Sequence, residues 1–358
     1  MAKERLNIAI IGQGRSGKNI HGAFYRSELN THFSLKYAVD KDPVLRAKAE
    51  EIYPGVTTFA DYRELFSLTD VDLVVNASYS NEHAPITRDL LSHGFSVLTE
   101  KPMGATYTEC MSLDLLAKKN GVRLFVFHNT QKAPFYIHAK KLLVGGTLGE
   151  PRQISIRYNA LARRWDWQTL QKKLAGSAYN TGPHPFAMAL GFLGGSPDTR
   201  VVFSKLDRSL TFGDADDYVK AIITCPGGPV VDVEISSTDA FSDYNLKVQG
   251  TRGTLVSTPK KYRLKYMVEG ENPPREVVEG SLRDADGMPV YCREKLVLHE
   301  EEGTYEGTAF ETGTAGIYSD VYYALTEGRE PEVTNEFAAR VTGIIEQIHA
   351  ANPLTVKF

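Results

Sequence analysis

The 358-residue sequence contains few cysteines, and their placement argues against disulfides and metal centres. There are three, an odd number, and they are widely separated: Cys110, Cys225 and Cys292. A disulfide framework needs pairs, and a zinc knuckle needs cysteines or histidines at short, regular spacings. The nine histidines show no HxxxH or HExxH spacing. We therefore expect neither a disulfide framework nor a bound metal.

Long apolar runs and an excess of one charge are also missing. No apolar stretch approaches the roughly 20 residues that a membrane-spanning helix needs. The first residues also lack the long apolar stretch and cleavage site of a secretory signal. The formal net charge is −3 with both signs interspersed, whereas nucleic-acid binding needs a clustered basic face. We expect a cytoplasmic protein that binds no membrane and no nucleic acid.

The length and an ordinary globular composition suit two domains. Up to residue 128, strand-like segments alternate with helical patterns. The predicted strands are residues 6–11, 35–39, 56–59, 71–77, 96–99 and 123–127, and the predicted helices are 18–27, 43–52, 62–68, 85–93 and 108–119. Such alternation predicts an α/β fold with a parallel, doubly wound Rossmann sheet over residues 1–128.

Beyond residue 130 the hydrophobic pattern changes to a period of two. A helix is predicted at 135–144, strands at 153–158, 219–224, 230–236, 246–249, 255–257 and 262–268, and closing helices at 315–325 and 337–349. This pattern favours a mostly antiparallel sheet with one buried face. We expect a second α+β domain over 129–358, with its last helices packing back on the first domain. Residues 269–289 are polar and rich in Gly and Pro, which predicts an exposed excursion.

A glycine-rich turn follows the first predicted strand directly and fits the pattern GxGxxG. It comprises Gly12, Gln13, Gly14, Arg15, Ser16 and Gly17. In a strand–turn–helix context the first glycine permits a tight turn, the second lets a pyrophosphate approach the backbone, and the third allows close helix–strand contact. The helix N-terminus then offers N–H groups to phosphate. The turn predicts a dinucleotide site.

Asp40 ends the second predicted strand, 23 residues after Gly17. A carboxylate there can accept hydrogen bonds from the ribose hydroxyls and repel a 2′-phosphate, which favours NAD over NADP. Lys41 and Arg15 are nearby cations that could soften this discrimination.

The fifth predicted strand ends in Thr99-Glu100-Lys101-Pro102. Ligands of open α/β sheets bind at the carboxyl ends of the strands. Lys101 therefore lies where chemistry is expected, and its ammonium could stabilise developing alkoxide charge.

Several segments together resemble the Gfo/Idh/MocA family, that is, proteins like glucose–fructose oxidoreductase and inositol dehydrogenase. The matching segments are residues 12–17, Asn76-Ala77-Ser78 with His83, residues 94–102, Gly146-Thr147-Leu148-Gly149 and Gly250-Thr251-Arg252-Gly253-Thr254. The resemblance covers nearly the whole chain. It implies a nicotinamide-dependent oxidoreductase acting on CH–OH groups of sugars, cyclitols or their derivatives. It also implies a homodimer or homotetramer packed through the second sheet, and cofactor contacts from Ser78, His83, Glu100 and Lys101.

The resemblance places the family's catalytic lysine at Lys101 and its catalytic histidine at His184. The family's Asp-x-Gly-x-His pattern reads Asn180-Thr181-Gly182-Pro183-His184 here, so Asn180 stands where an aspartate is commoner. His184 precedes Pro185 and an apolar helical pattern, so the positive end of a helix should keep its ring neutral. Asn180 can orient the ring without supplying charge, or donate its amide to the substrate.

Residues 163–168 combine aromatic rings with planar hydrogen-bonding groups. The segment contains Arg163, Arg164, Trp165, Asp166, Trp167 and Gln168. Aromatic platforms beside such groups suit the apolar faces and hydroxyl rims of sugars. With Lys101, Asn180, Thr181 and His184, the residues Arg163, Trp165, Asp166 and Trp167 are the predicted substrate contacts; the alternative is that the tryptophans pack a loop and the arginines face solvent.

Two other functions remain open at this point. One is a glycosidase or lyase that keeps NAD bound and cleaves a glycoside through transient oxidation and elimination. The other is a non-catalytic NAD(H)-binding regulator on the same fold, because a fold does not determine a function.

Overall fold

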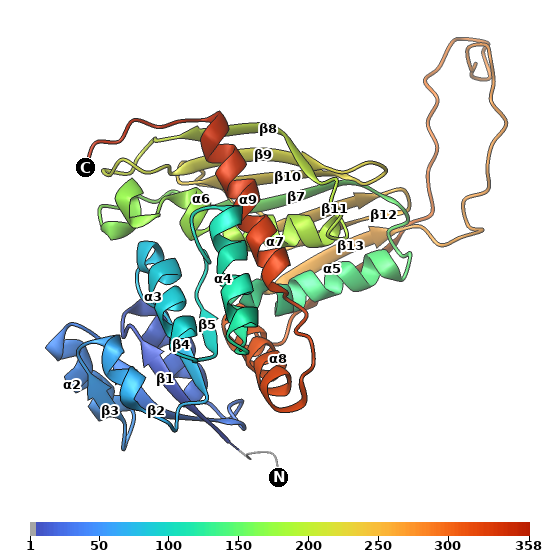
Figure 1. Cartoon of the computed structure of the whole chain (residues 1–358). Helices are drawn as coiled ribbons and strands as arrows, with labels where there is room; N and C mark the ends of the chain where they lie inside the picture. The colour runs from blue at the N-terminus through green and yellow to red at the C-terminus, as the bar shows by residue number, and fades with distance from the viewer. Residues whose placement is uncertain (1–4) are drawn as a thin grey trace.

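The computed structural model describes residues 5–358, which form two sheets with helices between them (Figure 1). The first sheet has six parallel strands in the order β3-β2-β1-β4-β5-β6. They are β1 (Leu6–Ile11), β2 (Phe33–Val39), β3 (Thr57–Phe59), β4 (Leu73–Asn76), β5 (Val97–Thr99) and β6 (Leu124–Val126). The predicted doubly wound parallel sheet is confirmed.

Helical segments cover both faces of this sheet. They are η1 (Gly17–His21), α1 (Gly22–Tyr25), α2 (Pro43–Ile52), η2 (Tyr62–Ser67), α3 (Ser80–Ser92) and α4 (Tyr107–Lys119). Side chains along β1 alternate between two cores, as the strand period of two requires. Ile8 and Ile10 pack with α1 and α2, whereas Ala9 and Ile11 pack with α3 and α4.

The start of α3 differs from the prediction. The helix begins at Ser80, whereas the pattern predicted a start at Pro85. Proline is common at the first position of a helix, so Pro85 resembled a helix start. Here it lies inside the helix.

The second sheet has eight strands in the order β14-β13-β12-β11-β7-β10-β9-β8. They are β7 (Pro151–Asn159), β8 (Arg200–Asp207), β9 (Tyr218–Thr224), β10 (Val230–Ser236), β11 (Leu246–Gly250), β12 (Gly253–Ser257), β13 (Lys261–Tyr266) and β14 (His299–Thr304). All neighbours are antiparallel except β7 and β10. The two edge strands, β8 and β14, were not predicted, because edge strands bury few side chains and β14 carries Glu300, Glu301 and Glu302.

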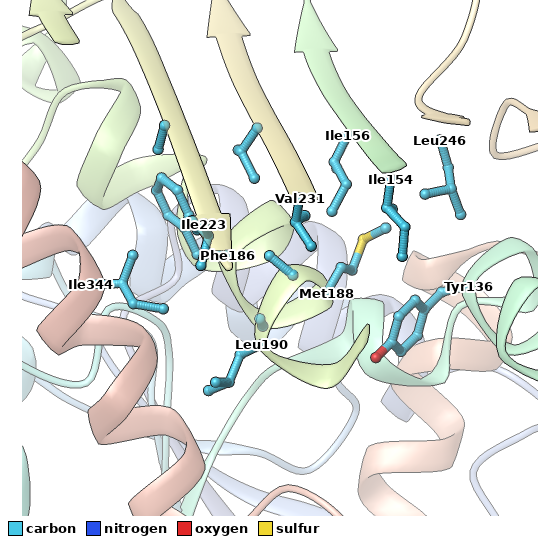
Figure 2. Close-up of a cluster of buried hydrophobic side chains, with 14 of the residues drawn as sticks. Tyr136, Ile154, Ile156, Phe186, Met188, Leu190, Ile223, Val231, Leu246 and Ile344 are labelled. Carbon is cyan, nitrogen blue, oxygen red and sulfur yellow. The ribbon is translucent and has the colours of Figure 1, made fainter. Parts of the chain in front are cut away.

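The remaining helical segments lie between the sheets or against the first one. They are η3 (Asn129–Lys132), α5 (Pro134–Val144), η4 (Trp167–Thr169), η5 (Gln171–Lys173), α6 (Ser177–Asn180), α7 (Pro183–Phe192), η6 (Ala309–Gly313), α8 (Thr314–Glu327) and α9 (Asn335–Ala351). Helices α5, α7 and α9 cover one face of the second sheet, and Figure 2 shows Phe186 and Leu190 of α7 beneath Ile223 and Val231.

The last two helices also belong to the Rossmann cores. Ile317 and Tyr318 of α8 pack with the α1–α2 side of the first sheet. Ala338 and Ala339 of α9 pack with its α3–α4 side, while Ile345 further along α9 is in the core of the second sheet. The two domains therefore share a helix.

The face of the second sheet opposite these helices carries charge. Arg157 pairs with Asp232 at 2.6 Å, and Lys220 pairs with Asp232 at 2.7 Å and with Glu234 at 3.0 Å. Between β13 and β14 the chain makes a long exposed arm that extends well away from the sheet (Figure 1). The predicted excursion at 269–289 is thus confirmed and continues to the start of β14. Among residues 5–358, no helix combines the length and apolarity needed to cross a bilayer.

Truncating a buried leucine tests this core. Leu190→Ala on α7 removes a fully buried side chain, so we expect the free energy of unfolding to fall by about 2–5 kcal/mol. Leu115→Ala, the same substitution at a residue that is 62% exposed on α4, should change it by less than about 0.5 kcal/mol. Urea unfolding followed by circular dichroism measures both, and equal losses would contradict the described packing.

Candidate active site

The glycine-rich turn after β1 has the geometry of a phosphate-binding loop. Gly12 has φ +89°, and a side chain there would overlap the carbonyl oxygen of Ala77. A side chain on Gly17 would overlap the carbonyl oxygen of Gly12, so the helix can approach the turn only through glycine. At Gly14 the space is open to 4 Å. This is the cradle that a pyrophosphate needs beside the N–H groups of a helix start.

Asp40 lies beside this loop at the end of β2. Its Oδ2 accepts a hydrogen bond from the backbone N–H of Gln13 at 2.7 Å, and its Oδ1 accepts one from Asp42 at 2.9 Å. The carboxylate is thus held at the end of β2, where dinucleotide folds carry the acidic residue that binds ribose, with lone pairs to spare. The neighbouring cation Lys41 turns to Glu82 at 3.4 Å, and Arg15 is exposed.

Ser78 and His83 form hydrogen bonds at the ends of β4 and β5. The Ser78 hydroxyl donates to Asn76 Oδ1 at 2.7 Å. His83 is buried, with Nδ1 2.8 Å from the carbonyl oxygen of Pro102 and Nε2 3.1 Å from that of Ser78. Both ring nitrogens are therefore engaged by main-chain oxygens, and His83 acts on the site by holding the turn after β5.

Lys101 crosses from that turn to the second domain. Its Nζ donates a hydrogen bond to the main-chain carbonyl of Asn180, at the end of α6, at 2.8 Å. Burial lowers the pKa of Lys101, although the charge of Glu100 acts against this shift. The Lys101–Pro102 peptide bond is cis.

Glu100 is a buried carboxylate held in a polar chain. Its Oε2 accepts from the Lys101 backbone N–H at 3.1 Å, and its Oε1 lies 3.3 Å from His21 Nε2. His21 Nδ1 is 2.8 Å from the hydroxyl of Tyr318 on α8, which is 2.6 Å from that of Tyr25. Burial alone would raise the pKa of Glu100, but His21 and the Lys101 charge outweigh it and lower the pKa to about 2. The site therefore contains an ionised carboxylate beside the lysine.

His184 is the second residue of α7, as the sequence predicted for a residue near a helix start. Its Nδ1 lies 3.3 Å from Thr130 Oγ1, and its ring stacks toward Tyr158 with centroids 6.4 Å apart. The ring keeps some exposed surface. Its pKa lies well below the ordinary value because of burial first, and then because of the Lys101 charge and His128. The imidazole is therefore neutral near pH 7, as the sequence predicted, and burial rather than the helix end is the largest cause.

His128 is a site residue that the sequence reasoning missed. It lies two residues after the end of β6 and is 2% exposed, and its Nδ1 meets no partner among the described residues. Burial, and then the charge of Lys101, lower its pKa to about 4. The rule that ligands gather at the carboxyl ends of parallel strands could have found it.

A cavity of about 290 Å³ opens beside Asn180 and is lined almost entirely by polar side chains. It is formed mainly by Tyr158, Asn159, Arg164, Gln168, Ser177, Asn180, Thr181, Thr211, Asp216, Asp217, Ser236, Ser237 and Asn245. Gln168, which was not predicted as a contact, donates from Nε2 to Asn180 Oδ1 at 2.9 Å. A larger hollow of about 850 Å³ is formed by β11–β14 and the exposed arm, and none of the predicted site residues lines it.

The other predicted contacts of residues 163–168 lie outside the lining of the 290 Å³ cavity. Trp165 is 78% exposed, and the Arg163 guanidinium lies 5.1 Å from the ring centroid of Phe212. Trp167 packs edge-on against Tyr79 of the first domain, with centroids 4.8 Å apart. Asp166 pairs with Arg164 at 2.7 Å. Among residues 5–358, no group of three or more His, Cys, Asp or Glu side chains gathers as metal ligands would.

Comparison with known proteins agrees with both halves of this architecture. Residues 6–128 match the GFO_IDH_MocA model, described as an oxidoreductase family with an NAD-binding Rossmann fold, and residues 136–256 match the GFO/IDH/MocA C-terminal domain. The oxidoreductase YdgJ of Escherichia coli, itself uncharacterised, is 26% identical over 78% of this chain and 79% of its own length. The 2,7-anhydro-N-acetylneuraminate hydratase of Mediterraneibacter gnavus is 25% identical over 68% of this chain and 66% of its own.

Solved structures share the fold. GenD2 from gentamicin A biosynthesis, in complex with NAD, superposes with a TM-score of 0.76, covering 98% of this chain and 95% of its own at 20% identity.

The open space at Gly14 gives a test of the phosphate loop. Gly14→Ala adds a methyl group where the protein leaves room, so thermal stability should hold while NADH affinity falls about tenfold or more, since a loss of about 1.4 kcal/mol is sufficient. Gly280→Ala, at an equally open glycine on the arm, is the matched control and should change neither. Fluorescence titration with NADH measures affinity. If Gly14→Ala binds NADH as tightly as the wild type, the pyrophosphate of the cofactor does not bind at this loop.

The charge of Lys101 gives a pH prediction for His184. Because that positive charge lowers the pKa of His184, Lys101→Met should raise this pKa, and the ring should take up its proton at a higher pH than in the wild type. Lys172→Met, at an exposed lysine of η5, should leave it unchanged. NMR titration of the ring protons measures the pKa. Identical titrations in the wild type and Lys101→Met would show that the Lys101 charge does not influence His184.

Proposed function

Because this chain belongs to the GFO/IDH/MocA family of oxidoreductases, we propose that it transfers a hydride between NAD and a secondary alcohol carbon of a sugar, cyclitol or sugar derivative. One observation carries the proposal: Lys101 of the first domain is hydrogen-bonded to Asn180 of the second, and its charge acts on the nearby His184. Lys101, just after the carboxyl end of β5, is a cation whose charge reaches a neutral base, and these are the groups that alcohol oxidation needs.

The residues of the loop fit NAD. The cradle at Gly14 accommodates a pyrophosphate, and the Asp40 carboxylate suits free ribose hydroxyls and opposes a 2′-phosphate. Lys41 is drawn toward Glu82, which reduces its capacity to bind such a phosphate. When bound, the nicotinamide ring supplies a carbon that accepts or returns the hydride.

The side chains divide the remaining work. In the oxidative direction the substrate C–H bond breaks with departure of the hydride, the C=O bond forms, and the hydroxyl proton passes to the neutral imidazole of His184. The Lys101 ammonium donates a hydrogen bond to the same oxygen and stabilises its developing negative charge. In the reductive direction the proton returns from the imidazolium to the oxygen.

The lining of the 290 Å³ cavity supports this substrate class. Its amide, hydroxyl, guanidinium and carboxyl groups suit a compound with many hydroxyls. The relative that acts on 2,7-anhydro-N-acetylneuraminate has a sugar derivative as its substrate by name.

A second candidate reaction is elimination or hydration through transient oxidation, with the cofactor regenerated in each cycle. Asn180 at the usual aspartate position and the hydratase relative both favour it. The two reactions differ in their balance. A dehydrogenase accumulates NADH and an oxidised product, whereas the second reaction changes the sugar with no net NADH. Absorbance at the NADH band together with mass spectrometry of the products distinguishes them.

Replacing the lysine tests the proposed chemistry. Lys101→Ala should lower turnover by about 10²-fold or more with little change in NADH affinity, since it removes a group that acts on the transition state. Lys172→Ala is the surface control and should be neutral. Steady-state assays across sugars, cyclitols and their ketones provide the rates. A matching loss of NADH binding would make Lys101 structural, and a wild-type enzyme inactive on the whole panel would count against the proposed reaction.

A further inference from the structure

Arg164 determines which groups donate and which accept in the hydrogen bonds beside Asn180. A guanidinium can only donate hydrogen bonds. Arg164 Nη2 donates to Gln168 Oε1 and also pairs with Asp166 at 2.7 Å. The oxygen of the Gln168 amide must therefore be the atom that faces Arg164.

The orientation of the Gln168 amide in turn fixes that of the Asn180 amide. With its oxygen at Arg164, Gln168 presents Nε2, which donates to Asn180 Oδ1 at 2.9 Å. The carbonyl oxygen of the Asn180 amide is thus occupied. Its Nδ2 group keeps two N–H donors, and these meet no acceptor within residues 5–358. Arg164, Gln168 and Asn180 all line the 290 Å³ cavity, so the donors are available to its occupant.

The main chain of Asn180 meanwhile holds Lys101, whose Nζ donates to the Asn180 carbonyl at 2.8 Å. Two donors, an ammonium and a primary amide, therefore come from one point of the site. An aspartate at this position would present an acceptor that receives a proton from a substrate hydroxyl. The amide presents hydrogen atoms, which a hydroxyl can meet only by turning its own proton elsewhere.

We propose that the Arg164–Gln168–Asn180 relay selects substrates with an acceptor-only oxygen, a carbonyl or a carboxylate, beside the carbon held at Lys101. Gln168 is a positioning residue in this scheme, because it acts through Asn180. The inference rests on the proposed function for the reaction itself. Recognition, however, is measurable by binding without any turnover.

Gln168→Glu reverses the relay without altering Asn180. The new carboxylate still accepts from Arg164 but has no hydrogen to donate, so the Asn180 amide should turn its Nδ2 toward it and leave Oδ1 facing the cavity. Asn180→Asp should present an acceptor directly. Gln168→Met removes the relay without adding charge and should leave the amide free to turn either way. Melting temperatures near that of the wild type identify folded variants.

The probes are matched pairs that differ in one group, titrated calorimetrically into the full-length protein freed of nicotinamide, so that neither member of a pair can react. The pair of scyllo-inosose and scyllo-inositol compares a ketone with a hydroxyl, and D-glucuronate and D-glucose compare a carboxylate with a hydroxymethyl. The wild type should bind the acceptor-only member of at least one pair about tenfold more tightly, the size expected for one polar group matched or left unpaired. Which pair responds tells ketone from carboxylate.

Gln168→Glu should bind scyllo-inositol more tightly than scyllo-inosose, and Gln168→Met should bring the two close to equality. The neutral pair is decisive, because the new carboxylate also repels glucuronate. A wild type that prefers the hydroxyl partner, or binds neither member of either pair, would overturn the inference, as would an unchanged ratio in folded Gln168→Glu. Selective binding without any NADH turnover would refute the proposed reaction but support the relay. Turnover by the wild type, with no reversal of the binding preference in Gln168→Glu, would support the reaction but refute the relay.

Discussion

The hydrogen bond from the Lys101 ammonium to the carbonyl of Asn180 joins the two domains at the point where the proposed chemistry takes place. A partly buried ammonium loses hydration, and a carbonyl dipole together with the ionised Glu100 next to it replaces some of that stabilisation. Because the acceptor is a main-chain atom, the side chain at position 180 can vary without breaking the bond. Lysine placement thus depends on how the second domain sits, and specificity depends on the side chain that it presents.

That placement is reinforced by the packing of the last two helices. Tyr318 of α8 reaches the buried chain that ends at Glu100, and α9 contributes Ala339 to one core and Ile345 to another. Hinge motion between two domains is the ordinary expectation when their interface is small and polar. Here a shared helix and a continuous buried contact oppose free rotation, which suits a site whose two reactive groups come from different domains.

Much of this architecture could be predicted from the chain alone. The glycine turn is recognisable from sequence because Gly12 and Gly17 stand where any larger residue would overlap the backbone. The strand–helix alternation around it is also a local pattern. The end of the fifth strand pointed to Lys101, but its catalytic role and His184 were found through resemblance, since no local pattern relates residues so far apart in the chain. His128 could have been found from its position after a parallel strand.

The relay from Arg164 to Asn180 was beyond sequence reasoning for a different reason. Residues 163–168 attracted attention for their tryptophans, which pack at the domain boundary or face solvent, while the segment contacts the cavity through Arg164 and Gln168. Which members of a polar loop point inward depends on partners supplied elsewhere, in this case by α6. The edge strands β8 and β14 escaped for a related reason, since they bury too little to show a period.

The contact between His21 and Tyr318 also bears on how the protein is made. His21 immediately precedes α1, whereas Tyr318 lies on the penultimate helix, 297 residues later. During translation the N-terminal Rossmann domain leaves the ribosome long before Tyr318, which packs against the α1–α2 side of its sheet. Until α8 is synthesised, the surface around Ile8, Ile10 and Phe24 lacks the part of its cover that Ile317 and Tyr318 supply. For most of its synthesis the nascent chain therefore exposes apolar surface that is buried only when α8 packs against it.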